Sequence, residues 1–91
     1  MEFKQEINKF VLYNDDGKQQ IGYITFKLDK STLIILHTVV SPLFQGQGMA
    51  KILIEKVINY AKEQKFMIKP ICSYSVSYFE KHPEYLDIIV K

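Results

Sequence analysis

A short glycine-bearing stretch in the middle of the chain has the clearest chemical signature: Gln45-Gly46-Gln47-Gly48-Met49-Ala50. A β-branched run at residues 32–40 precedes it, and a long amphipathic helical pattern follows it. Such a turn between a strand and a helix aims several backbone N–H groups at one point, where the helix N-terminus adds partial positive charge. The sequence therefore predicts a site for a phosphate-bearing cofactor.

The chain's one cysteine, Cys72, is a second candidate for chemistry. It ends a short apolar stretch and directly precedes Ser73, a residue type that often caps a helix. A helix N-terminus makes a thiol more nucleophilic, which would suit covalent catalysis. A lone cysteine at the end of a strand is equally well explained as a small buried hydrophobic residue.

The two histidines allow acid–base chemistry but also have ordinary explanations. Imidazole suits general-base catalysis near neutral pH, although His37, in an apolar strand, could equally be a hydrogen-bonded structural residue. His82 precedes Pro83 at an expected helix end, where a dipole contact explains it. No cluster of His, Cys and Asp has metal-ligand spacing, so we expect no metal site.

Three strands are expected ahead of the glycine stretch, at residues 5–13, 21–28 and 32–40. Turn residues at 14–17 and 29–31 separate them, which predicts an antiparallel meander with the charged first strand at its edge. Because residues 32–40 are apolar on both faces, this strand is expected to be central and covered on both sides.

Behind the glycine stretch the period becomes helical over residues 49–65. One apolar stripe contains Ala50, Leu53, Ile54, Val57, Ile58 and Ala61. We expect a strand at residues 66–71, parallel to the strand at 32–40, and then a second helix that Ser73 caps and that ends near His82. The apolar tail at residues 85–90 should dock on the sheet or beside that helix. The expected fold is one α/β (α+β) domain spanning residues 1–91.

Composition narrows the function classes. The 91 residues include 12 lysines, no arginine and 10 acids, a balance too even for a dedicated nucleic-acid binder. A single cysteine excludes an internal disulfide and fits a reducing compartment. No apolar run is long enough for a signal peptide or a membrane span, so we expect a soluble, cytoplasmic protein with no nucleic-acid or membrane partner.

The spacing of Gln45, Gly48 and Ala50 resembles the acetyl-CoA-binding motif Gln/Arg-x-x-Gly-x-Gly/Ala of the GNAT superfamily of N-acetyltransferases. Three further stretches resemble a small branch of GNAT-like proteins: His37-Thr38-x-Val40-x-Pro42, Pro70-x-Cys72-x-Tyr74 and His82-Pro83-Glu84-Tyr85. Together with the order of the expected elements, the resemblance covers roughly residues 36–85.

The resemblance implies a minimal GNAT-like fold and a site for acetyl-CoA. Backbone amides of the glycine stretch would hold the pyrophosphate, and the pantetheine arm would lie between two strands that separate near Val40 and Cys72. The implied cofactor-binding residues are Thr38, Val39, Val40, Phe44, Gln45, Gly46, Gln47, Gly48, Met49 and Ala50.

The resemblance also implies catalytic roles, with departures from the family pattern. Cys72 would lie near the thioester, where an acetyl-cysteine intermediate is conceivable. Many relatives place a tyrosine before Glu-Lys to protonate the CoA thiolate, whereas this chain has Phe79 there and Tyr78 beside it, about 100° away around the helix. The branch often has glutamate after His-Thr, where this chain has Val39. Tyr74 and Tyr78 share one face of the helix, where either could approach the sulfur or pack against the sheet. Packing is expected for Tyr74, whereas Tyr78 remains a candidate acid and His37 a candidate base.

These features favour transfer of acetyl from acetyl-CoA to an amine, directly or through Cys72. The alternative is a CoA- or acyl-CoA-binding module without efficient catalysis, and a more remote one is a small interaction domain whose glycine turn binds nothing. The full-size family has two helices where this chain has only the turn at residues 14–17. An open acceptor side favours a large acceptor such as a protein or peptide, or a site that a partner completes. We expect a monomer or weak dimer.

Overall fold

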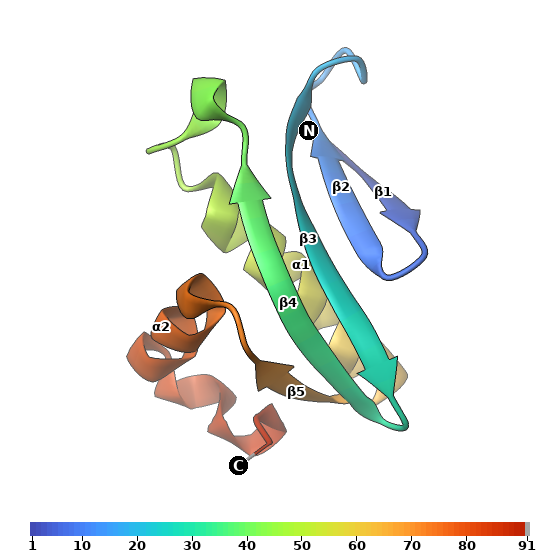
Figure 1. The fold of residues 1–91 in the computed structure, drawn as a ribbon, viewed down its shortest axis with the longest axis vertical. Coiled ribbons are helices and arrows are strands. Elements are labelled where there is room, and N and C mark those ends of the chain that lie inside the picture. Colours follow the sequence, from blue (N-terminus) through green and yellow to red (C-terminus); the bar gives the residue numbers. More distant parts are fainter. Residues whose placement is uncertain (91) are drawn as a thin grey trace.

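A five-stranded mixed sheet carries the fold of residues 1–90, the part of the chain that the computed structural model describes (Figure 1). The strand order follows the sequence, with β1–β4 antiparallel and β5 parallel to β4. The strands are β1 Glu2–Glu6, β2 Lys9–Tyr13, β3 Gln20–Asp29, β4 Thr32–Val40 and β5 Met67–Pro70. The helices are α1 Met49–Gln64 and α2 Ser73–Lys81, with 3-10 turns at Pro42–Phe44 and Pro83–Ile88.

The expected first strand at residues 5–13 is wrong, because this segment forms a hairpin of β1 and β2. Asn8 adopts a φ of 61°, and the chain reverses between Glu6 and Lys9, which pair across the two strands. Asparagine tolerates this left-handed conformation better than most residues. Ile7 at the tip is exposed, so its apolar side chain had suggested a continuing strand where the backbone turns. The meander therefore has four strands, and the charged β1 is its edge.

The helix α1 confirms the amphipathic pattern that the sequence predicted. Its buried residues are Leu53, Ile54, Val57, Ile58 and Ala61, all at most 2% exposed. They pack against Ile24, Leu33 and Ile35 of the sheet in one core cluster. Burial of each large side chain stabilises the fold by roughly 1.5–3 kcal/mol. Ala50, the first residue of the predicted stripe, is only partly buried, because it lies beside a pocket.

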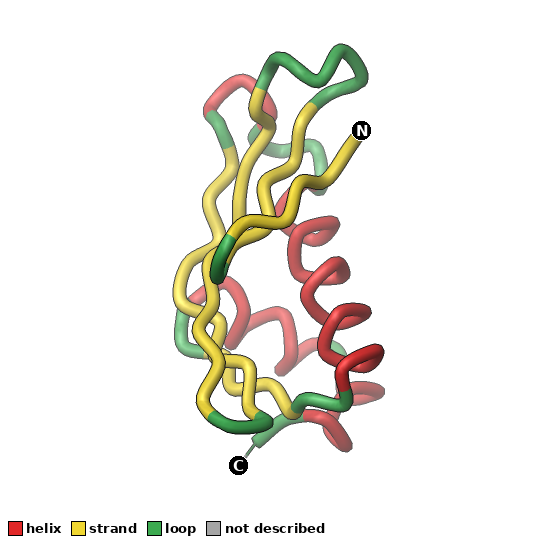
Figure 2. The backbone as a smooth tube through the Cα atoms, turned by 90° about the vertical axis from the view of Figure 1, so that its right-hand side faces the viewer, coloured by secondary structure: helices red, strands yellow, loops and turns green. Residues whose placement is uncertain are grey.

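Both helices lie on one face of the sheet, as Figure 2 shows, so the expectation that β4 is covered on both sides is wrong. The pairing of β3 with β4 shifts between Thr25 and Phe26, which gives β4 an extra residue at position 36. This bulge changes the alternation of side chains. Leu33 and Ile35 point to the helices, whereas His37 and Val39 pair with Thr25 and Tyr23 on the helix-free face.

The outer edge of the sheet is β5, which the C-terminal tail partly covers. The expected parallel strand is confirmed: Met67 and Ile71 donate backbone hydrogen bonds to Ser31 and Ile35, on the β4 side. On the other side, Val90 donates to the carbonyl of Ile68 at 2.9 Å, and Ile89 forms a parallel bridge with Ile68. The apolar tail therefore docks on the edge of the sheet, which is one of the two positions expected from the sequence.

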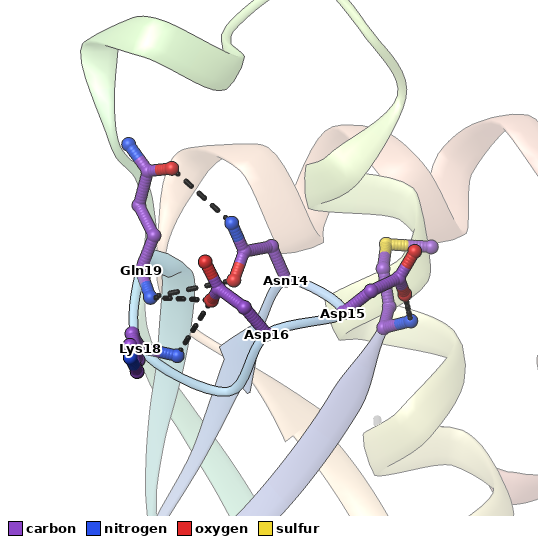
Figure 3. A network of polar contacts seen from close by, with 6 residues as sticks. Asn14, Asp15, Asp16, Lys18 and Gln19 are labelled. Atoms are coloured by element: carbon purple, nitrogen blue, oxygen red, sulfur yellow. Dashed lines mark hydrogen bonds and ion pairs between the residues drawn. The ribbon is translucent and has the colours of Figure 1, made fainter.

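Residues 14–19 between β2 and β3 form a loop with its own polar network (Figure 3). Asn14 Nδ2 donates to Gln19 Oε1 at 3.2 Å, and the backbone N–H of Lys18 donates to Asp16 Oδ1 at 2.7 Å. The N-terminal ammonium of Met1 pairs with Asp15, and this hydrogen bond and charge lower the pKa of the Asp15 carboxyl. The predicted turn is thus confirmed, and it joins the strands directly.

Within residues 1–90, no helix combines the length and the apolar character needed to span a membrane.

Candidate active site

The site is built where β4 and β5 separate. The two strands pair from Thr32 with Met67 to Ile35 with Pro70, and β5 then ends. On its other side β4 stays paired with β3 as far as Val40, which lies opposite Gly22. The edge of residues 36–40 that faces away from β3 is therefore left without a partner strand. The expected gap between the two strands is present.

The chain leaves β4 through a fixed turn. After the 3-10 turn Pro42–Phe44, Gln45 Nε2 donates to the carbonyl of Val40 at 3.2 Å, and Gln47 Nε2 donates to that of Leu43 at 3.4 Å. Gly46 and Gly48 both adopt a φ of 78°, a left-handed conformation that favours glycine. The two glutamine side chains thus order the turn from within, which leaves its glycines facing open space.

The glycines are required by backbone conformation and not by packing. A Cβ added to Gly46 or Gly48 would meet nothing within 4 Å. Gly48 is also the N-cap of α1, and its carbonyl accepts from the N–H of Ile52 at 3.4 Å. The N–H groups of the first helical turn precede the intrahelical hydrogen bonds and are free to bind an anion. Within this turn no acidic side chain opposes such an anion.

A pocket of about 280 Å³ opens over this turn. Seven of its lining residues were predicted from the sequence: Val40, Phe44, Gln45, Gly46, Gly48, Met49 and Ala50. Three other predicted residues do not line it. Thr38 and Val39 lie further back on β4, and the side chain of Gln47 turns onto the carbonyl of Leu43.

Sequence reasoning missed two residues that line the pocket, Lys51 and Tyr74. Lys51 follows the motif in the first turn of α1, and it is the one cation among the lining residues. Tyr74, at the start of α2, is 38% exposed and faces the pocket, where the sequence had suggested packing against the sheet. The signal for Lys51 was its position directly behind Ala50. Tyr74 could have been found from its place two residues after Cys72.

Cys72, and not Ser73 as expected, is the N-cap of α2. Its Sγ accepts a hydrogen bond from the N–H of Ser75 at 3.4 Å. The Sγ also lies 3.5 Å from Thr38 Oγ1 on β4 and 3.1 Å from Ser75 Oγ. The sulfur therefore lies at a helix N-terminus, across the strand gap from β4, and it is only partly buried.

Tyr78 lies within an aromatic cluster further along α2. Its ring stacks on that of His82 at 4.0 Å between centroids and meets the ring of Phe79 edge-on at 5.5 Å. Burial, with smaller contributions from the charges of Tyr85, Glu55, Tyr74 and Glu84, raises the pKa of Tyr78 to about 12. Tyr78 thus keeps its proton at neutral pH and is a weaker acid than a free tyrosine.

His37 lies on the opposite face of β4 from Thr38, and it is exposed there. The structure brings Thr38 and Cys72 together on the helix side, while His37 faces the open side of the sheet. The Nδ1–H of His82 donates a hydrogen bond to the carbonyl of Tyr78 at 2.7 Å, near the end of α2. Among residues 1–90, no group of three or more His, Cys, Asp or Glu side chains is arranged to hold a metal ion.

Comparison with solved structures finds the same architecture in acetyltransferases. A GCN5-like protein of Staphylococcus aureus is 32% identical over 98% of this chain and 87% of its own, with a TM-score of 0.77. Two more distant structures share the fold. N-acetylglutamate synthase from Neisseria gonorrhoeae, solved with coenzyme A and N-acetyl-glutamate, is 18% identical over 81% of this chain and 18% of its own, with a TM-score of 0.67. Tetrahymena GCN5 is 21% identical over 80% of this chain and 48% of its own, with a TM-score of 0.66.

No curated protein sequence matches the chain. Residues 9–88 match the family described as GCN5-related N-acetyl-transferase. The matched segment begins at β2 and includes the glycine turn, Cys72 and the whole of α2. This chain therefore belongs to the GCN5-related N-acetyltransferase family.

Proposed function

We propose that this protein binds acetyl-CoA and transfers its acetyl group to an amine. The observation that carries the proposal is the arrangement of the pocket: an open glycine turn at the start of α1 leads to a strand gap with a cysteine sulfur at its wall. A phosphate-bearing ligand fits the turn, and a thioester would react at the gap. The matching family and the coenzyme A in the Neisseria gonorrhoeae relative support the same ligand.

The residues present fit the chemical parts of coenzyme A. Free N–H groups at Met49, Ala50 and Lys51 suit a pyrophosphate, and the Lys51 ammonium adds a positive charge. The open main-chain edge of residues 36–40 suits the amide groups of a pantetheine arm, which would bind there as an extra strand does. The pocket's apolar wall includes Val40, Phe44 and Met49.

We further propose that the acetyl group passes through Cys72. The thiolate attacks the thioester carbonyl, a new bond forms between the acetyl carbon and Sγ, and the bond to the CoA sulfur breaks. CoA leaves as a thiolate and takes up a proton. The amine then attacks the acetyl-cysteine, loses a proton to solvent and releases the Cys72 thiolate. The net reaction consumes acetyl-CoA and amine and yields CoA and amide.

The acceptor in this proposal is a large amine substrate, such as a protein side chain or terminus. The β2–β3 connection is a short loop, so the face of the sheet with His37 and Val39 remains open to such a substrate. An acceptor that arrives from this face would contact the exposed His37, whereas the amine that attacks the acetyl-cysteine loses its proton to solvent. Tyr78, with its raised pKa, would serve at most as a slow proton donor to CoA.

A CoA-binding module without turnover is the second candidate function. The aromatic cluster around Tyr78 favours it, because this tyrosine is engaged in stacking and has a raised pKa. Both candidates require CoA binding, and only the transfer that passes through Cys72 requires its sulfur.

Replacing Cys72 by alanine tests the two candidates. Intact-mass spectra of the wild-type chain with acetyl-CoA should show one added acetyl group, and Cys72→Ala should show none, because the attacking sulfur is gone. Affinity for CoA, measured by calorimetry, should remain within about threefold of wild type, since the pocket over the glycine turn is unchanged.

Ser73→Ala is the matched control, because Ser73 is the exposed neighbour of Cys72 on the same helix. It should form the acetyl adduct at the wild-type rate. A wild-type chain that binds CoA and forms no adduct would contradict the Cys72 route. If Cys72→Ala kept full turnover with an amine acceptor, direct transfer would replace it.

Lys51 should contribute to affinity through its charge. We expect Lys51→Gln to weaken CoA binding roughly threefold to tenfold, because an exposed cation near phosphate is worth about 1 kcal/mol. Calorimetry at two salt concentrations should show that the loss shrinks as ionic strength rises. Lys18→Gln, in the exposed loop after β2, removes the same charge and should leave the affinity unchanged. Equal losses for both variants would contradict a specific role for Lys51.

A further inference from the structure

We propose that Thr38 and Ser75 are positioning residues that hold the Cys72 sulfur and stabilise its thiolate for attack on a thioester. The inference rests on the proposed transfer through Cys72, and it identifies the two side chains that prepare the nucleophile. Both contact Cys72 directly, and neither belongs to the glycine turn or lines the pocket above it.

Three hydrogen bonds join Ser75 to Cys72, and Ser75 is 0% exposed. Its N–H donates to Cys72 Sγ at 3.4 Å, and its hydroxyl donates to the Cys72 carbonyl at 2.8 Å. The Cys72 thiol in turn donates to the Ser75 hydroxyl at 3.1 Å. The thiol proton therefore has an acceptor, and the sulfur that remains after its loss has the Ser75 amide as a donor.

Thr38 reaches the same sulfur from the opposite wall of the gap, with 3.5 Å between Oγ1 and Sγ. It does so because the bulge at Thr25/Phe26 turns Thr38 toward the helices. A hydroxyl that donates to sulfur stabilises the anion more than the neutral thiol, since charge-assisted hydrogen bonds are the stronger ones. Thr38 is held on a strand that stays paired with β3, so its position is well defined. The sulfur thus has donors on two separate elements.

These contacts indicate the order in which the thiol proton and the sulfur lone pair move. The thiol proton leaves the partly exposed Cys72 directly to solvent, and Thr38 Oγ1–H and Ser75 N–H then donate to the thiolate. The sulfur lone pair forms the bond to the acetyl carbon, and the electrons of the broken bond stay with the CoA sulfur. Neither Thr38 nor Ser75 forms a bond to the acetyl group.

Alkylation of Cys72 by iodoacetamide tests the inference without acetyl-CoA, and this cysteine is the only one in the chain. At pH 7, Thr38→Val should slow alkylation about three- to tenfold, because it loses a donor to the thiolate. Ser75→Ala should slow it less, because it keeps the backbone N–H and loses only the hydroxyl that anchors the helix cap on the Cys72 carbonyl. A thiolate that is less stabilised is a stronger nucleophile, and this partly offsets the smaller amount of thiolate, so the change in rate stays in this range. At pH 10, where thiols are ionised with or without these donors, all rates should approach that of wild type.

Thr38→Ser keeps the hydroxyl and should restore most of the rate at pH 7, and Ser73→Ala should match wild type at both pH values. Thermal unfolding confirms that each variant is folded. Equal slowing at pH 7 and pH 10 would show a change of access and overturn the inference, as would unchanged rates at pH 7. Calorimetry with CoA separates the two levels: a wild-type chain that binds no CoA overturns the proposed function, whereas CoA binding with unchanged alkylation overturns this inference alone.

Discussion

Gly48→Glu should reduce CoA affinity roughly a hundredfold or more while the domain stays folded. The change places a carboxylate at the N-terminus of α1, in the open space where the proposed pyrophosphate would bind. Two like charges about 4 Å apart repel by roughly 4 kcal/mol near a protein surface, which exceeds a hundredfold in affinity. Calorimetry with CoA measures the loss, and circular dichroism measures the fold.

Gly48→Asn is the matched control for this experiment. Gly48 has a φ of 78°, so any side chain there has a backbone cost, roughly 1–2 kcal/mol for an ordinary residue and less for asparagine. The asparagine variant shares this cost without the carboxylate, and its affinity should fall only a few-fold. Wild-type affinity in Gly48→Glu would contradict binding of a phosphate at this turn.

Gly22→Ala should be the most destabilising of the conservative glycine replacements. A Cβ on Gly22 would lie 2.5 Å from the carbonyl oxygen of Val39, 3.2 Å from the Cα of Val40 and 3.3 Å from Leu53 Cδ1. The nearest atom is backbone, so β4 has to shift. We expect a loss of about 2–3 kcal/mol in the free energy of unfolding, which for a chain of this size lowers Tm by roughly 8–24 °C.

The matched control is Gly17→Ala, in the loop after β2. Gly17 has a φ of 69°, and its added Cβ would meet only Glu2 Oε2 at 3.8 Å. This variant has a backbone cost of about 1–2 kcal/mol and no collision. Thermal unfolding of both variants gives the comparison. A Gly22→Ala variant as stable as wild type would show that β4 moves at little cost, and then the gap beside Thr38 would be less rigid than its pairing indicates.

Periodicity predicted the parts of the fold whose burial follows a regular repeat. The apolar stripe of α1 is one example, since every third or fourth residue meets the sheet. The glycine turn was predicted because a left-handed φ at Gly46 and Gly48 has a direct sequence signature. The glycine turn and the residues beside it supply most of the pocket's lining, whereas the apolar stripe of α1 faces the sheet.

The errors arise where the repeat is interrupted. The extra residue in β4 exchanges the faces of the following side chains, so Val39 points outward although its neighbours had suggested a doubly covered strand. The turn at Asn8 has no glycine or proline to mark it. Cys72, not Ser73, caps the helix, because its sulfur accepts a hydrogen bond from a backbone N–H. The general preference for serine at helix caps does not predict this. Lys51 and Tyr74 line the pocket through tertiary placement that spacing alone does not give.

The two borders of the sheet also bear on how this chain can associate with others. β1 alternates the charged residues Glu2, Lys4 and Glu6 along one border. On the other, Pro70 occupies the position whose amide would point away from β4, and Val90 already uses the carbonyl of Ile68. Proline has no N–H, and charged residues disfavour pairing between sheets. A second polypeptide therefore meets charged side chains at the β1 border and few free main-chain groups at the β5 border, and both features disfavour extended intermolecular sheets.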